Sequence, residues 1–147
     1  SGIVRKVAEA TSAGQRTLLL ADDPAAPSAF GIDQVIYTFA SGKEAKSFGD
    51  KLTSNLADCA DRVPTASVKK GPSTSGKAAD GVAFSGRSFL ITQKTAEDVE
   101  VPFRVAVVRV GDHVAYLLAN PSAGFDFSAD QWKAIMTRTA QRVSQLP

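Results

Sequence analysis

The apolar residues of this chain recur at two spacings, every second position in some segments and every third or fourth in others. A spacing of two is typical of a strand, and it is clear in residues 33–40, where Val35, Tyr37 and Phe39 occupy alternate positions. Residues 65–68 are a weaker strand candidate, and residues 2–10 fit either a strand or a helix. The segments predicted to be strands are residues 16–21, 33–40, 86–94, 101–110 and 113–119.

Two other segments have the spacing of an amphipathic helix. The first follows Ser41, which with Glu44 matches a capping box, and is predicted to end near Arg62, just before a proline. The second follows Ser128, where Gln131 completes the same motif. The apolar face of the first is Ala45, Phe48, Leu52, Leu56, Cys59 and Val63, and that of the second is Trp132, Ile135, Met136, Thr139, Val143 and Leu146.

The order of these elements predicts the fold class. Strands follow one another instead of alternating with helices, which favours hairpins and an antiparallel sheet. We expect an α+β domain with a twisted antiparallel sheet of about five to six strands and two main amphipathic helices packed on it. Residues 69–80 are predicted to form a polar loop that is too short to separate two domains, so residues 1–147 are expected to form one domain.

Residues 101–110 and 113–119 are mainly apolar on both of their faces. Strands with this pattern are usually central in a sheet and covered on both sides. The helices are expected to cover one side. The N-terminal segment, a second subunit or a ligand are the alternatives for the other side, and cover from within the chain is favoured because exposed apolar patches of this size are rare.

Composition narrows the classes of function. The chain is 44% hydrophobic and 22% charged, as globular proteins are, and its net charge of +2 comes from cations spread along the sequence, which gives nucleic-acid binding no support. One cysteine excludes an intramolecular disulfide, and one histidine excludes a metal site of several His or Cys ligands, so no cofactor is expected. No apolar run approaches the ~20 residues of a membrane span.

Three features of the sequence could suggest a catalytic or phosphate-binding site, but each has a simpler structural interpretation. Cys59 lies on the apolar face of the first predicted helix and is interpreted as a small hydrophobic residue, not a nucleophile. His113 is predicted to be a solvated turn residue, with Asp112 on the opposite face of the strand. Residues 71–77 superficially match the spacing of a phosphate-binding loop, but Ala78 stands where that loop has Ser or Thr. We therefore expect no enzymatic activity.

Arginines on predicted strands are the candidates for binding. Arg87, Arg104 and Arg109 could grip an anionic ligand, because a guanidinium binds such groups bidentately. Arg87 and Arg104, together with Tyr116 on the last predicted strand, are the predicted ligand-binding residues. The alternative is that the arginines lie at the rim of the sheet and balance Glu97, Glu100 and Asp112.

Residues 33–62 and 101–119 together resemble a known family. A strand ending in Tyr-x-Phe, an Ala/Phe/Leu-rich helix with a cysteine near its end, and paired closing strands joined by Val-Gly-Asp are similar to the extracellular sensor domains and related lipoproteins of actinobacteria, such as the PknH-like sensor domain of a mycobacterial receptor Ser/Thr kinase. The resemblance covers roughly residues 33–146. It implies an antiparallel sheet with helices, a cleft, and ligand sensing without catalysis.

These observations favour a noncatalytic sensor or ligand-binding domain at the cell surface, excised from a longer exported protein. A membrane tether outside this segment is compatible with this hypothesis. The domain's expected partner is a small-molecule, lipidic or cell-envelope ligand, with no nucleic acid involved. The alternative is a structural or assembly module that forms a homodimer through an apolar sheet face. A third hypothesis, an enzyme using Ser/Lys or carboxylate chemistry, has no motif in its favour.

Overall fold

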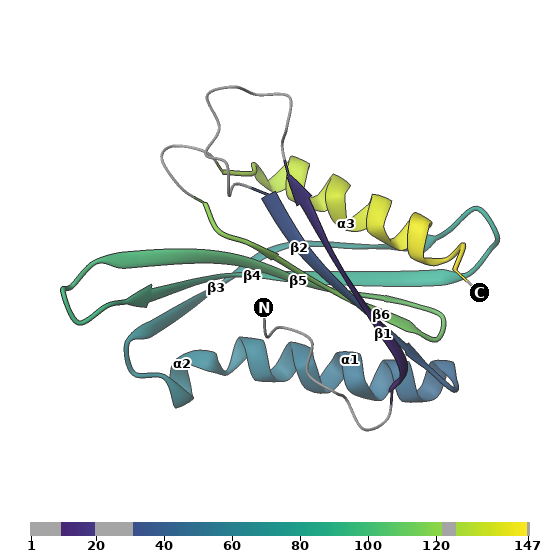
Figure 1. Cartoon of the computed structure of the whole chain (residues 1–147), viewed down its shortest axis with the longest axis horizontal. Coiled ribbons are helices and arrows are strands. Elements are labelled where there is room, and N and C mark those ends of the chain that lie inside the picture. Colours follow the sequence, from purple (N-terminus) through teal and green to yellow (C-terminus); the bar gives the residue numbers. More distant parts are fainter. Residues whose placement is uncertain (1–9, 20–30, 122–125, 147) are drawn as a thin grey trace.

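The computed structural model describes residues 10–19, 31–121 and 126–146 (Figure 1). The strands pair antiparallel in one sheet with the spatial order β1-β2-β6-β5-β4-β3. This confirms the predicted α+β class, with an antiparallel sheet and two main helices packed on it. The elements are β1 (Ala10–Leu19), β2 (Gly31–Phe39), α1 (Gly42–Ala57), α2 (Cys59–Arg62), β3 (Ala66–Lys77), β4 (Ala83–Lys94), β5 (Glu100–Val110), β6 (His113–Ala119) and α3 (Ala129–Val143).

A helix covers each face of the sheet. Figure 1 shows α1 on one side and α3 on the other, with the central strands β5 and β6 between them. Along β5, Ala106 and Val108 belong to the core beneath α3, whereas Val107 belongs to the core beneath α1. The expectation that the helices would cover a single side was therefore wrong. The two apolar faces of the central strands reflect one helix on each.

The core beneath α3 is built around large buried side chains. Trp132 and Met136 are 1% and 0% exposed, and the Trp132 ring stacks on Phe127 with centroids 5.6 Å apart. The helix can lie this close because β4 has a glycine beneath it: a Cβ on Gly86 would lie 3.2 Å from Met136 Sδ. Burying one such side chain contributes roughly 1.5–3 kcal/mol.

The core beneath α1 is aromatic. Phe48 contacts Tyr37 and Phe39 on β2, with ring centroids 5.3 Å and 5.1 Å apart. The predicted helix to Arg62 is interrupted, because Asp58 caps the end of α1 with φ −94° and ψ 11° and α2 follows as a separate turn. The apolar face predicted for α1 nevertheless packs on the sheet as expected.

The polar loop predicted at residues 69–80 is largely strand β3, so that prediction was wrong. An edge strand needs no apolar alternation, because its backbone pairs with β4 while many of its side chains remain exposed. Its proline is accommodated at a register shift between Lys70 and Ser73. Strand β1 begins at Ala10, six residues before the predicted segment. The prediction for residues 2–9, and that for residues 20–21 of the segment 16–21, lie outside the described residues.

Candidate functional site

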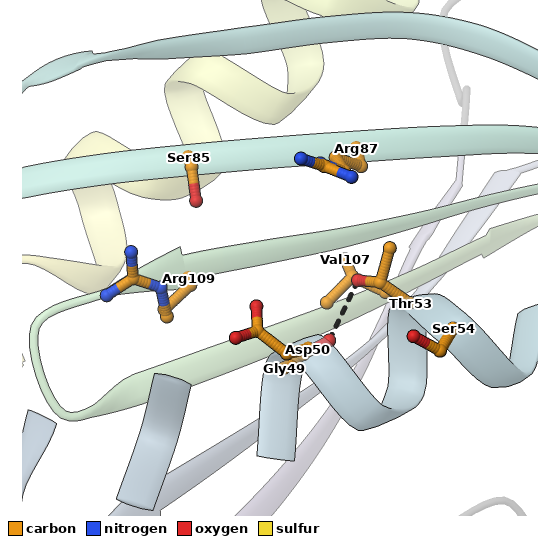
Figure 2. A pocket seen from close by; sticks show the side chains of 8 residues that line it. All are labelled: Gly49, Asp50, Thr53, Ser54, Ser85, Arg87, Val107 and Arg109. Carbon is orange, nitrogen blue, oxygen red and sulfur yellow. Dashed lines mark hydrogen bonds between the residues drawn. The ribbon is translucent and has the colours of Figure 1, made fainter. Parts of the chain in front are cut away.

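A cavity of about 220 Å³, open to solvent, lies beside α1 where the helix passes over β4 and β5 (Figure 2). One side of it, here called the helix wall, belongs to α1, and the other, here called the sheet wall, belongs to the two strands. The helix wall consists of Gly49, Asp50, Thr53 and Ser54, and the sheet wall of Ser85, Arg87, Val107 and Arg109.

Strand register brings the sheet wall together. Arg87 pairs with Val107 and Ser85 with Arg109, so the four side chains project from the same face of the sheet toward α1. Arg87 and Arg109 are diagonal neighbours on adjacent strands, and such positions are roughly 7–8 Å apart. Two guanidinium groups therefore reach the same small volume.

The cavity carries more positive than negative charge. Lys46 Nζ donates a hydrogen bond to Asp50 Oδ2 at 2.7 Å, and this bond is the main reason that the pKa of Asp50 lies below its ordinary value. Slight burial opposes the shift, and the charges of Arg109 and Arg87 add to it. Neither arginine side chain has a hydrogen bond or ion pair with another described residue. Together with Lys46, the two arginines outnumber the single carboxylate, so positive charge remains available to a ligand.

The lining residues offer groups that bind an anion. Besides Asp50 and the two arginines, three of the eight carry a hydroxyl, and none is a histidine or cysteine. Across the part of the chain that the structure describes, no group of three or more His, Cys, Asp or Glu residues could hold a metal ion. Two guanidinium groups beside several hydroxyls can bind and orient an anion.

Of the predicted ligand-binding residues, Arg87 lines the cavity and Arg104 lies on the opposite face of the sheet. Arg104 forms a bidentate ion pair with Asp126, with Nη2 donating to Oδ2 at 2.8 Å. This pair raises the pKa of Arg104 and lowers that of Asp126. The structure thus separates the two arginines, and Arg109 joins Arg87 at the cavity. The partner of Arg104 is Asp126 and not one of the rim acids named from the sequence.

Tyr116 shares a row of the sheet with Arg87. The register runs from Arg87 through Val107 to Tyr116, so their backbones are two strands apart, roughly 10 Å. Tyr116 is half-buried beneath α1, and burial raises the pKa of its phenol, with smaller contributions from Cys59 and Tyr37. It lies on the same face as the cavity without lining it.

The helix wall was missed by sequence reasoning. Asp50, Thr53 and Ser54 appear in the sequence as polar residues away from the apolar face of the helix, which is what any solvated helix face contains. The signal that singles them out is their position opposite the sheet wall, and that depends on how α1 lies across the strands (Figure 2).

His113 is buried and hydrogen bonded, so the prediction of a solvated turn residue was wrong. It is 4% exposed, its Nδ1 lies 2.9 Å from Thr38 Oγ1, and its Nε2 lies 3.2 Å from Asp112 Oδ1. Asp112 therefore does not point away from it. The order of acid, imidazole and hydroxyl resembles a catalytic relay, but the ring is enclosed, and its contacts tie β2 to the turn before β6.

The remaining sequence candidates fall outside the cavity. Residues 71–77 are part of β3, whereas a phosphate-binding loop connects a strand to the start of a helix. Cys59 is half-buried at the start of α2. Neither residues 71–77 nor Cys59 lines the cavity.

No family model, curated protein or solved structure matches this chain significantly. The resemblance to actinobacterial sensor domains therefore stays a prediction, and a functional proposal must rest on the cavity itself. None of the helices in the described residues is long and apolar enough to cross a membrane.

Proposed function

We propose that this chain is a noncatalytic ligand-binding domain that recognises a small anion in the cavity between α1 and strands β4 and β5. The observation that carries the proposal is the pair Arg87 and Arg109. Both line the cavity, and neither guanidinium forms a hydrogen bond or ion pair with another described residue. An arginine that served only to balance a neighbouring acid would have that acid as its partner, as Arg104 has Asp126.

Electrostatics favour an anionic ligand. A guanidinium remains charged at every physiological pH, and it forms paired hydrogen bonds with carboxylate or phosphate oxygens. Arg87 is exposed and Arg109 is half-buried, so solvent and salt weaken their attraction. Binding is therefore expected to be strongest at low ionic strength.

The cavity lining also favours one of the ligand classes that the sequence suggested. Val107 is the one large apolar side chain in the cavity wall. Sites for lipid tails or drug-sized ligands are lined mostly by apolar residues, so a small polar ligand fits better than a lipid chain. An extracytoplasmic location remains part of the proposal on the strength of the family resemblance alone.

The assembly alternative has less support. A homodimer through an apolar sheet face needs such a face to be open, but the apolar residues of β5 and β6 pack beneath α3 on one side and α1 on the other. No specific observation favours assembly over ligand binding.

Titration of the protein with inorganic phosphate at low salt, followed by amide chemical shifts, tests the proposal. We expect saturable shifts at Ser85, Arg87 and Arg109. Arg87→Gln and Arg109→Gln should each weaken binding by about tenfold, because each removes charge-assisted hydrogen bonds. Arg138→Gln is the matched control, since Arg138 is exposed on α3 at the other face of the sheet, and it should bind phosphate like the wild type.

Two results would contradict the proposal. One is a wild-type protein that binds neither phosphate nor sulfate at low salt. The other is a double variant, Arg87→Gln with Arg109→Gln, that remains folded and binds the anion as tightly as the wild type does.

A further inference from the structure

We infer that the ligand of this cavity is a phosphomonoester whose carbon skeleton carries free hydroxyl groups, as in a polyol or sugar phosphate. This inference rests on the proposed function and names its substrate class. It comes from a difference between the two walls: the sheet wall presents two guanidinium groups, which only donate, whereas Asp50 and Thr53 on the helix wall can only accept (Figure 2). The Ser54 hydroxyl beside them can do either.

The sheet wall fits a group with three terminal oxygens. Ser85 lies directly opposite Arg109 and two residues before Arg87, so one hydroxyl and two guanidinium groups form a triangle of donors. A carboxylate has two oxygens, and a single guanidinium can donate a hydrogen bond to each of them. A phosphomonoester has three terminal oxygens and up to two negative charges, and it can engage both arginines at once.

Two side chains of the helix wall, Asp50 and Thr53, need donors from the ligand. Asp50 is a carboxylate and can only accept. Thr53 Oγ1 already donates its proton to the Gly49 carbonyl at 2.8 Å, so toward a ligand it can act only as an acceptor. A ligand whose phosphate faces the sheet wall would therefore gain hydrogen bonds to α1 by carrying hydroxyl groups at its other end.

The local charges favour a hydroxyl over an ammonium as that donor. Lys46 already lies 2.7 Å from Asp50 Oδ2, and Arg109 and Arg87 are near enough to act on the same carboxylate. A ligand ammonium would enter a site that already holds three cations and one carboxylate. A hydroxyl donates a hydrogen bond without adding to this repulsion.

Size and lining agree with a small ligand. The cavity volume of about 220 Å³ is below the roughly 300–1,000 Å³ of sites for drug-sized ligands. A short polyol phosphate is of that order, and Val107, the one large apolar side chain in the lining, gives a hydrocarbon tail little to pack against.

Isothermal titration of the wild type with four probes tests this class: inorganic phosphate, glycerol 3-phosphate, phosphoethanolamine and glycerol. We expect glycerol 3-phosphate to bind about tenfold tighter than inorganic phosphate, which is the effect of one hydrogen bond to a charged group. Phosphoethanolamine should bind no tighter than inorganic phosphate, and glycerol should not bind measurably.

The variant Asp50→Ala should distinguish the contribution of the ligand's hydroxyl groups to affinity from that of its phosphate. It removes an exposed acceptor, so glycerol 3-phosphate should lose its tenfold advantage over inorganic phosphate and bind about as tightly as inorganic phosphate does. Inorganic phosphate should bind at least as tightly as before, because a repelling carboxylate is gone. Asp130→Ala is the matched control, since Asp130 is exposed in the first turn of α3 on the other face of the sheet. It should leave both affinities unchanged.

The outcomes distinguish this inference from the proposed function. If inorganic phosphate binds through Arg87 and Arg109 but glycerol 3-phosphate binds no tighter, or keeps its advantage in Asp50→Ala, the ligand class is wrong and anion binding stands. If no anion binds, both fail. Vesicles containing phosphatidylglycerol present the headgroup as a phosphodiester. Sedimentation with these vesicles, without binding of free glycerol 3-phosphate, would also overturn the inference.

Discussion

At the scale of single residues, the ion pair between Arg104 and Asp126 joins the sheet to the segment that enters α3. Arg104 is on β5, and Asp126 also accepts a hydrogen bond from the Phe127 backbone N–H at 2.7 Å. The Arg104 side chain is 18% exposed and that of Asp126 is 41% exposed. Solvent therefore screens the pair, and its contribution to stability is on the order of 1 kcal/mol or less.

We expect Asp126→Asn to be less stable than the wild type at neutral pH, and the difference to disappear in acid. The folded-state pKa of Asp126 is below its ordinary value. Its charge therefore stabilises the fold above pH about 4, and this contribution is lost as the pH falls through the lowered pKa. Urea unfolding of both proteins at pH 7 and pH 2.5 measures the gap, and an equal gap at both pH values would rule out the carboxylate charge as its cause.

The placing of Arg87 and Arg104 shows where residue-level prediction stops. Alternation along a strand tells which residues share a face within that strand, and both strands were predicted correctly. Which face of β4 matches which face of β5 depends on the register across their turn, where Asp98 adopts a φ of +61°. The sequence does not specify that turn, so it could not show that Arg109, and not Arg104, lies beside Arg87.

At the scale of elements, the starts of the two long helices are capped differently. Ser128 Oγ accepts from the Gln131 N–H at 3.1 Å, and the Gln131 side chain accepts from the Ser128 N–H at 2.8 Å. Ser41 Oγ accepts from the Glu44 N–H at 3.2 Å, which is one half of the same motif. The sequence predicted a capping box at both helices, because this motif is local and its donors lie within one turn. The structure confirms the box at Ser128, whereas at Ser41 the return bond from Glu44 is not formed.

We expect Ser128→Ala to lower the free energy of unfolding by about 1 kcal/mol, because it leaves a helix N–H without its acceptor. Ser41→Ala should cost less, since only one weaker bond is lost there. Thermal or urea unfolding followed by circular dichroism measures both. A larger loss for Ser41→Ala would contradict the ranking that we draw from the hydrogen bonds.

The elements that could be predicted from the sequence are those whose apolar residues recur at a regular spacing. Strands β2, β5 and β6 and helices α1 and α3 each bury a face, so their patterns reveal them. Strand β3 buries little and gives no such pattern, because its order comes from backbone pairing with β4. Its polar, Gly- and Pro-containing sequence therefore suggested a loop, although its partner strand holds it in the sheet.

At the scale of the whole molecule, α1 shields one apolar side of the sheet, and Phe48 is central to that contact. We expect Phe48→Ala to cost about 2–3 kcal/mol, somewhat below the value for a fully buried Phe, because Phe48 is half-buried. It should also increase ANS fluorescence by uncovering Tyr37 and Phe39. Urea unfolding and dye binding test this, with Leu146→Ala as the control because Leu146 is 44% exposed.

A Phe48→Ala protein as stable as the wild type would mean that α1 does not hold this side closed. Light scattering on the same variant is informative as well. If the uncovered sheet side drives association, the variant should be larger in solution than the wild type at the same concentration.

The irregularity in β3 has a consequence for neighbouring molecules. An outer strand with free backbone groups can recruit further strands and start a fibril. Here the pairing with β4 shifts register between Lys70 and Ser73, at a proline. Prolines and irregular pairing are among the features that keep an outer strand from continuing its sheet into another molecule. The same irregularity is therefore expected to hinder templated aggregation at this margin.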